Sequence, residues 1–275
     1  MSTELTPKVA VFFVGVGKCG TSWLYEFVKR HDLLSVPSLK EPYLIDEAPN
    51  KQAEIIKKLY ARKDNMADLS TLYYWDPDNA QKIYDYNPHA RIIITTRKPS
   101  HRITSHFGFL KRNGIVSEEN VAAYLAGGDP EAIVARSSYA DMINRYTAVF
   151  GADQVLVLPL EQLQQAPQIY VDRLCDSIGA DRVTLTPEDT KPVLRSARAR
   201  SFLAARIGKY AAGTLRSLGL LSFLGRCKSS AFIRYILFKE IEQDVTVNFG
   251  PRTKEISDLD QAYRMLLTDL DIEHT

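Results

Sequence analysis

Cysteine is scarce in this chain of 275 residues, and Cys19, Cys175 and Cys227 are widely spaced and odd in number. Such a set gives neither a disulfide framework nor the paired spacing of a zinc site. The five histidines are scattered without metal-ligand spacing, so we expect no metal site. Long apolar runs are also missing. The apolar run over residues 9–14 is too short for a signal segment or a membrane span, and no later run reaches the required length. These absences favour a soluble, cytoplasmic protein in a reducing compartment.

Net charge is also small, at +2, which gives no argument for a nucleic-acid partner. The charge is nevertheless uneven, since residues 191–239 contain many lysines and arginines among apolar residues and no acidic residue. Basic amphipathic helices of this kind can form one wall of an acceptor site and associate weakly with anionic membranes. A helical cap with solvated arginines is the alternative, and the sequence leaves both interpretations open.

The order of apolar runs and turns predicts an α/β fold. Residues 9–14 form a β-branched and aromatic run suited to a strand buried on both faces, and a glycine-rich turn leads into a helix over 21–31. Further strands are expected at 91–96 and 154–158, with helices at 79–86, 100–112, within 118–150 and at 168–178. Such alternation implies a parallel sheet covered on both sides. We expect one domain, 1–275, with an α/β core over 1–190 and a helical, basic C-terminal part over 191–275, in which residues 195–270 are wholly helical.

The turn between the first strand and helix, Gly15-Val16-Gly17-Lys18-Cys19-Gly20-Thr21-Ser22-Trp23, has the character of a phosphate cradle. Backbone N–H groups of such a turn, together with a helix N-terminus, bind anions. The nucleotide-triphosphatase pattern requires a lysine after the second glycine, but Thr21 stands there and Lys18 lies inside the turn. A tight turn with a solvated Lys18 is the alternative interpretation.

Two further segments carry groups suited to the same chemistry. At the end of the strand over 91–96, Arg97 and the helical Ser105 can hold a terminal phosphate through charge-assisted hydrogen bonds. After the first helix, Lys40 precedes Glu41, a carboxylate that can act as a general base. An exposed Lys-Glu pair on a loop is the plain alternative for the second segment.

These three segments resemble the motifs of PAPS-dependent sulfotransferases, in their bacterial and glycan-type branch. The turn is similar to the family's 5′-phosphosulfate loop, Arg97, Pro99, Arg102 and Ser105 fall in the register of its 3′-phosphate site, and Lys40-Glu41-Pro42 is similar to its Lys-Glu-Pro segment. Tyr43 stands where many members have histidine, and Leu69 replaces a family lysine before Ser70 and Tyr73.

The resemblance implies a three-layer, P-loop-like α/β domain with a central parallel sheet, and a role for each matching residue. The catalytic residues would be Lys18 and Glu41, with Asp46 as a supporting group. The donor 3′-phosphoadenosine 5′-phosphosulfate (PAPS) would be bound by Lys18, Cys19, Gly20, Thr21, Ser22, Trp23, Arg97, Ser105 and, on a weaker match, Arg252. The acceptor would be bound by Lys40, Tyr43, Asp46, Tyr73 and Tyr139.

The expected reaction is in-line transfer of a sulfuryl group from PAPS to a hydroxyl or amine of a small-molecule, glycan or lipid acceptor, without metal. Two other functions stay open at this point. A P-loop kinase or nucleotide hydrolase is disfavoured by the displaced lysine and by the lack of an aspartate at the end of the strand over 91–96. A non-catalytic nucleotide- or sulfate-binding module would keep the cradle and make Glu41 dispensable.

Overall fold

The computed structural model describes residues 7–190, 197–199, 238–240 and 247–272. Within it the chain forms two compact units, each built from separate stretches of sequence. The first unit comprises residues 1–98, 138–194 and 261–275, and the second comprises 99–137 and 195–260. The sequence-based prediction of a single domain stays a prediction.

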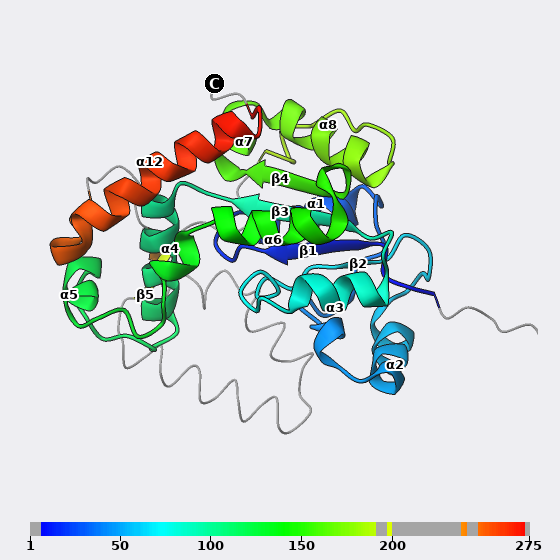
Figure 1. The fold of residues 1–275 in the computed structure, drawn as a ribbon, viewed down its shortest axis with the longest axis horizontal. Coiled ribbons are helices and arrows are strands. Elements are labelled where there is room, and N and C mark those ends of the chain that lie inside the picture. Colours follow the sequence, from blue (N-terminus) through cyan, green and yellow to red (C-terminus); the bar gives the residue numbers. More distant parts are fainter. Residues whose placement is uncertain (1–6, 191–196, 200–237, 241–246, 273–275) are drawn as a thin grey trace, which may run out of the picture. The chain divides into compact units, whose positions relative to one another are not determined.

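A four-stranded parallel sheet forms the centre of the first unit (Figure 1). Its strand order is β2 (Ala67–Asp68), β1 (Val11–Gly15), β3 (Arg91–Thr96) and β4 (Val155–Pro159). Strand β1 pairs in parallel with both β2 and β3. The expected strands at 9–14, 91–96 and 154–158 are thereby confirmed to within about two residues, whereas β2 is an addition.

Side chains of β1 alternate between the two faces of the sheet, and helices cover both faces. Phe12 and Val14 pack in one apolar cluster with α3 (Asn79–Tyr86) and α6 (Ala140–Phe150). Phe13 packs in a second cluster with α1 (Thr21–Arg30) and α8 (Pro167–Ile178). Figure 1 shows α3 and α6 in front of the sheet. The three layers of the predicted fold class are therefore present in this unit.

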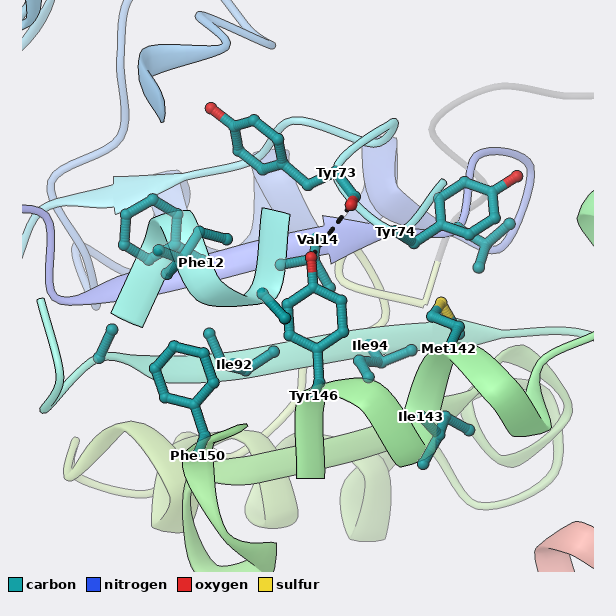
Figure 2. Packing of buried hydrophobic residues seen from close by; sticks show 14 of the residues in the cluster. Phe12, Val14, Tyr73, Tyr74, Ile92, Ile94, Met142, Ile143, Tyr146 and Phe150 are labelled. Atoms are coloured by element: carbon teal, nitrogen blue, oxygen red, sulfur yellow. Dashed lines mark hydrogen bonds between the residues drawn. The ribbon is translucent and has the colours of Figure 1, made fainter. Parts of the chain in front are cut away.

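The apolar cluster that contains Phe12 and Val14 also contains a hydrogen bond between α6 and the segment that follows β2. The hydroxyl of Tyr146 on α6 donates to the carbonyl of Tyr73, at 3.1 Å, in the middle of otherwise apolar packing (Figure 2). Asn79 of α3 donates to the same carbonyl, at 3.3 Å. The segment that follows β2 is therefore tied to both helices of this face.

Shorter elements complete the first unit. A one-turn helix over Leu44–Asp46 precedes α2 (Pro49–Leu59), a turn over Ala152–Gln154 precedes β4, and α7 (Leu160–Gln165) links β4 to α8. The helices expected at 21–31, 79–86 and 168–178 are confirmed as α1, α3 and α8. Among the described residues no helix is long and apolar enough to cross a membrane.

The second unit has its own apolar cluster. It gathers side chains of α4 (Pro99–Arg112), α5 (Val121–Ala126) and the N-terminal part of α12 (Thr253–Asp269), including Ile103, Leu125 and Ile256. One-turn helices cover Ala135–Ser137 and Gly250–Arg252. The helices expected over 100–112 and within 118–150 are confirmed as α4, α5 and α6.

The prediction that residues 195–270 are wholly helical is wrong at two places. Strands β5 (Ala197–Ala199) and β6 (Phe238–Glu240) pair with each other in antiparallel fashion. Each strand has three residues, too few to show an alternating pattern, and the pairing joins segments about 40 residues apart. The other residues of the basic stretch over 191–239 lie outside the described residues, so its predicted roles stay predictions.

Candidate active site

The cradle is the turn between β1 and α1, and β3 holds it from one side. The N–H of Val16 donates to the carbonyl of Thr95, at 2.9 Å, and the Thr95 hydroxyl donates to the carbonyl of Gly15, at 3.0 Å. Lys18 has a positive φ of 76°, which folds the turn back toward the start of α1. The loop is thus fixed at the carboxyl end of the parallel strands, where ligands of open α/β sheets bind.

Glycine is required at both ends of this turn. Gly15 has φ +137°, and a Cβ atom there would lie 2.8 Å from the carbonyl oxygen of Thr71 and 2.7 Å from the ring of Tyr74. Gly20 has φ +88°, and a Cβ atom there would lie 2.9 Å from Leu160. Residues with a side chain rarely adopt these φ values, so glycine at both positions allows the backbone to form the turn.

The first turn of α1 is suited to an anion. Gly20 is its N-cap and contributes no side-chain cap, and the first turn contains no acidic residue. The leading N–H groups of a helix lack intrahelical partners and carry partial positive charge. The Lys40 amine adds a full charge at this helix end, 3.1 Å from the Ser22 hydroxyl and 3.4 Å from the Thr21 hydroxyl.

Glu41 lies beside Lys40, with 3.9 Å between the amine and its Oε1 atom. The Thr71 hydroxyl donates to Oε1, at 3.0 Å, and the Tyr43 hydroxyl donates to Oε2, at 3.2 Å. Burial lowers the pKa of Lys40 and the neighbouring Glu41 opposes that shift, while burial and Glu41 together raise the pKa of Tyr43. Lys40 therefore lies near both the cradle and a carboxylate.

Two of the other residues expected to bind the donor have side chains engaged in packing. Cys19 is fully buried. Trp23 stacks on Phe27, with ring centroids 4.8 Å apart, and its indole N–H donates to the carbonyl of Asp189, at 2.7 Å.

Arg97, at the end of β3, is directed to the cradle. Its guanidinium makes a long hydrogen bond of 3.5 Å to the carbonyl of Lys18. The hydroxyl of Tyr139 donates to the carbonyl of Arg97, at 2.7 Å, and its ring packs edge-on against Tyr263. Lys18, Arg97 and Tyr139 thus belong to one cluster of the first unit.

Ser105 and Arg252, also expected at the donor, lie in the second unit. Ser105 is half-buried on α4. Arg252 donates to the carbonyl of Gly128, at 2.6 Å, and lies 3.5 Å from Glu255. Arg102, from the same sequence motif as Ser105, is buried and bonds to the Ser137 hydroxyl at 2.8 Å, which is a packing role within this unit.

Two residues expected on the acceptor side have surroundings of their own. Tyr73 is fully buried, and its hydroxyl donates to Asp68, at 2.9 Å, and accepts from the N–H of Ile45, at 3.0 Å. Asp46 is exposed, and partial desolvation raises its pKa, with Lys82 and Asp76 as its main charged neighbours. Their roles toward an acceptor stay predictions.

Sequence reasoning missed two residues of this region, Thr71 and Asp68. Thr71 contacts Glu41 through its hydroxyl and approaches Gly15 through its carbonyl. Asp68 is a fully buried carboxylate on β2. Thr71 lies between Ser70 and Tyr73 in a segment that resembles the family, but the resemblance gave it no role, and no local pattern marks Asp68.

Comparison with known proteins gives one family. Residues 8–210 match the family model described as a sulfotransferase domain. A sulfotransferase from Alicyclobacillus acidocaldarius has a similar fold, with TM-score 0.54 and 21% identity over 66% of this chain and 88% of that one.

Two further solved structures match at lower TM-scores. Mouse sulfotransferase SULT7A1 complexed with PAP gives 0.46, with 22% identity over 66% of this chain and 62% of that one. The sulfotransferase domain of the Synechococcus PCC 7002 olefin synthase gives 0.47, with 15% identity over 94% and 95% of the two chains. No curated protein matches the chain.

Proposed function

Because the chain belongs to the sulfotransferase domain family and is a PAPS-dependent sulfotransferase, we propose that residues 15–22 bind the 5′-phosphosulfate of PAPS and that Glu41 is the general base. The acceptor supplies a hydroxyl or an amine and is a small molecule, glycan or lipid. The observation that carries the proposal is the position of Lys40, which contacts the first turn of α1 and lies 3.9 Å from Glu41.

The cradle has the features that a doubly charged phosphosulfate needs. Uncapped N–H groups at the start of α1 offer hydrogen bonds, and Gly15 and Gly20 give the turn backbone conformations that other residues rarely adopt. Lys18 and Lys40 supply positive charge, which supports transfer without a metal. Arg97 is proposed to contact the 3′-phosphate.

The chemistry is a displacement at sulfur. Glu41 accepts the proton of the acceptor hydroxyl or amine while that oxygen or nitrogen forms the new bond to sulfur. The bond from sulfur to the 5′-phosphate oxygen breaks, and the 3′,5′-bisphosphate PAP leaves with the electron pair. Lys18 stabilises the negative charge that develops on the leaving oxygen, and preorganised charge of this kind commonly contributes more to rate enhancement than any other effect.

The position of Glu41 supports its role as the base. Both its oxygens accept hydrogen bonds, from Thr71 and from Tyr43, so the carboxylate is held in a fixed orientation. A fixed carboxylate near the donor site can take a proton without first reorganising.

Incubation with PAPS and a metabolite or glycan extract tests the proposal, with mass spectrometry to find products that have gained one sulfuryl group. Glu41→Gln is the matched variant, because the amide can still accept from Thr71 and can donate to the Tyr43 hydroxyl. We expect it to abolish transfer and to keep the affinity for PAP. Transfer at the parent rate by Glu41→Gln would remove Glu41 as the base, and absence of any product with the parent would contradict the proposed function.

A further inference from the structure

The loop that carries Glu41 has a strained backbone. Glu41 has φ 62° and Tyr43 has φ 51°, on either side of Pro42. Residues with a Cβ rarely adopt positive φ, and such a conformation persists only where the surroundings impose it. Something outside the loop must therefore hold it.

Three consecutive backbone N–H groups of this loop are held by one buried network. The N–H of Tyr43 donates to the Ser70 hydroxyl at 2.9 Å, and that of Leu44 donates to the Asp68 carboxylate at 3.2 Å. The N–H of Ile45 donates to the Tyr73 hydroxyl, at 3.0 Å. The hydroxyls of Ser70 and Tyr73 in turn donate to Asp68, at 2.5 and 2.9 Å, so all three contacts converge on one carboxylate.

This network is anchored to the core of the first unit. Asp68, Ser70 and Tyr73 are fully buried, and Asp68 lies in β2, in register with Phe12 of β1. The carbonyl of Tyr73 accepts from Tyr146, and Figure 2 shows the Tyr73 hydroxyl at the opposite end of the residue. The loop is thus tied through Tyr73 to the helical layer over the sheet.

The same contacts reach both oxygens of Glu41. Tyr43, whose N–H is held by Ser70, donates its hydroxyl to Oε2. Thr71, which follows Ser70 in the chain, donates to Oε1. A shift of the network therefore changes the direction of the Glu41 carboxylate.

We propose that Asp68, Ser70 and Tyr73 are positioning residues that fix the Glu41 loop in its strained form and so set the orientation of the base. This inference rests on the proposed function of Glu41. It assigns Tyr73 to holding the Glu41 loop through Ile45, and it assigns the same role to Asp68, which no sequence motif indicated.

The test compares two buried tyrosines. Tyr73→Phe removes the acceptor of the Ile45 N–H, whereas the matched control Tyr60→Phe removes a hydroxyl that donates only to the carbonyl of Ala67, at 3.1 Å. The measurements are the initial rate of PAP release from saturating PAPS with a metabolite extract of fixed composition, and the Kd for PAP. Hydrogen exchange of the peptide covering residues 41–46 reports on the loop. Ser70→Ala is the second variant, for the case that Tyr73→Phe does not fold.

We expect Tyr73→Phe and Ser70→Ala to lower the turnover rate about 10-fold to 100-fold, as small misplacements of catalytic groups do, with the Kd for PAP within about twofold. Exchange over residues 41–46 should rise in both variants, and Tyr60→Phe should match the parent in rate and exchange.

Parent-like turnover in folded Tyr73→Phe and Ser70→Ala, while Glu41→Gln is inactive, would overturn this inference and leave the proposed function intact. An equal loss in Tyr60→Phe would also overturn it, because the effect would then be general destabilisation. A parent that releases no PAP, or an active Glu41→Gln, would overturn the proposed function and this inference with it.

Discussion

Gly15 offers a direct test of how the cradle is built, through the variant Gly15→Ala. The added Cβ would lie 2.7 Å from the ring of Tyr74 and 2.8 Å from the carbonyl oxygen of Thr71. Tyr74 cannot easily move away from the added Cβ, because it is buried and its N–H donates to the carbonyl of Val14, at 2.9 Å. The Thr71 oxygen belongs to the backbone, so it can move only if the chain moves. The φ of +137° adds backbone strain that only glycine avoids.

The cost has two parts. Holding a non-glycine residue in a sparsely populated φ region costs about 1–3 kcal/mol. Overpacking at a buried contact costs a further 1–3 kcal/mol or so. The free energy of unfolding should therefore fall by roughly 2–6 kcal/mol, out of the typical 5–15 kcal/mol for a folded protein.

Gly17→Ala is the matched control in the same loop. Its Cβ would have only the Thr71 side chain nearby, at 3.7 Å, which is an ordinary contact. We expect its free energy of unfolding to stay within about 0.5 kcal/mol of the parent value, as for most unstrained substitutions.

Urea denaturation followed by circular dichroism measures both variants, and PAP binding measured by calorimetry reports on the cradle itself. Gly15→Ala should lower the urea midpoint and weaken PAP binding. If Gly15→Ala and Gly17→Ala unfold at the same urea concentration, the cradle is not built on the Gly15 contacts described above.

Three further predictions concern charge. Lys18→Ala should lower kcat on the order of 100-fold with a smaller effect on PAP binding, since its charge is needed where negative charge develops; steady-state kinetics with PAPS measure this, and an unchanged kcat would contradict the role. Arg97→Ala should weaken PAP binding by roughly 1.5–3 kcal/mol and leave the analogue without the 3′-phosphate nearly unaffected, whereas equal losses in calorimetry would refute a 3′-phosphate contact. Burial raises the pKa of Asp68 to about 6, so the stability that protonated Asp68 provides is lost as the pH rises from about 4 through 6. The parent should then lose roughly 3 kcal/mol more than Asp68→Asn between pH 4 and pH 7 in urea denaturation, and parallel pH profiles would argue against this shift.

The strand, turn and helix of the cradle could be predicted because their signals are local. The β-branched run at β1, the glycines at 15 and 20 and the amphipathic α1 are adjacent in sequence. The same holds for β3 and α4, where Pro99 marks the start of the helix. Local propensity and the tertiary fold agree at these elements, so they can be predicted from the sequence.

The network under Glu41 could not be predicted, because its contacts are distant in sequence. Leu44 bonds to Asp68 across 24 residues, and Thr71 bonds to Glu41 across 30. Strand β2 has two residues, too few for any periodicity, so nothing marked Asp68 as buried. The pair β5 and β6 was missed for the same reason, since neither strand shows a pattern without its partner.

The cradle and the Glu41 loop, the two halves of the site, are held by different parts of the chain. The cradle is built from residues 15–22 and the end of β3, whereas the Glu41 loop is held from β2 and the segment after it. Donor affinity and proton removal should therefore respond largely independently to substitution. Two residues link the halves. Lys40 contacts Ser22 at the start of α1 and lies 3.9 Å from Glu41, and Thr71 has its carbonyl near Gly15 while its hydroxyl donates to Glu41. A substitution at Lys40 or Thr71 should therefore change both donor affinity and proton removal.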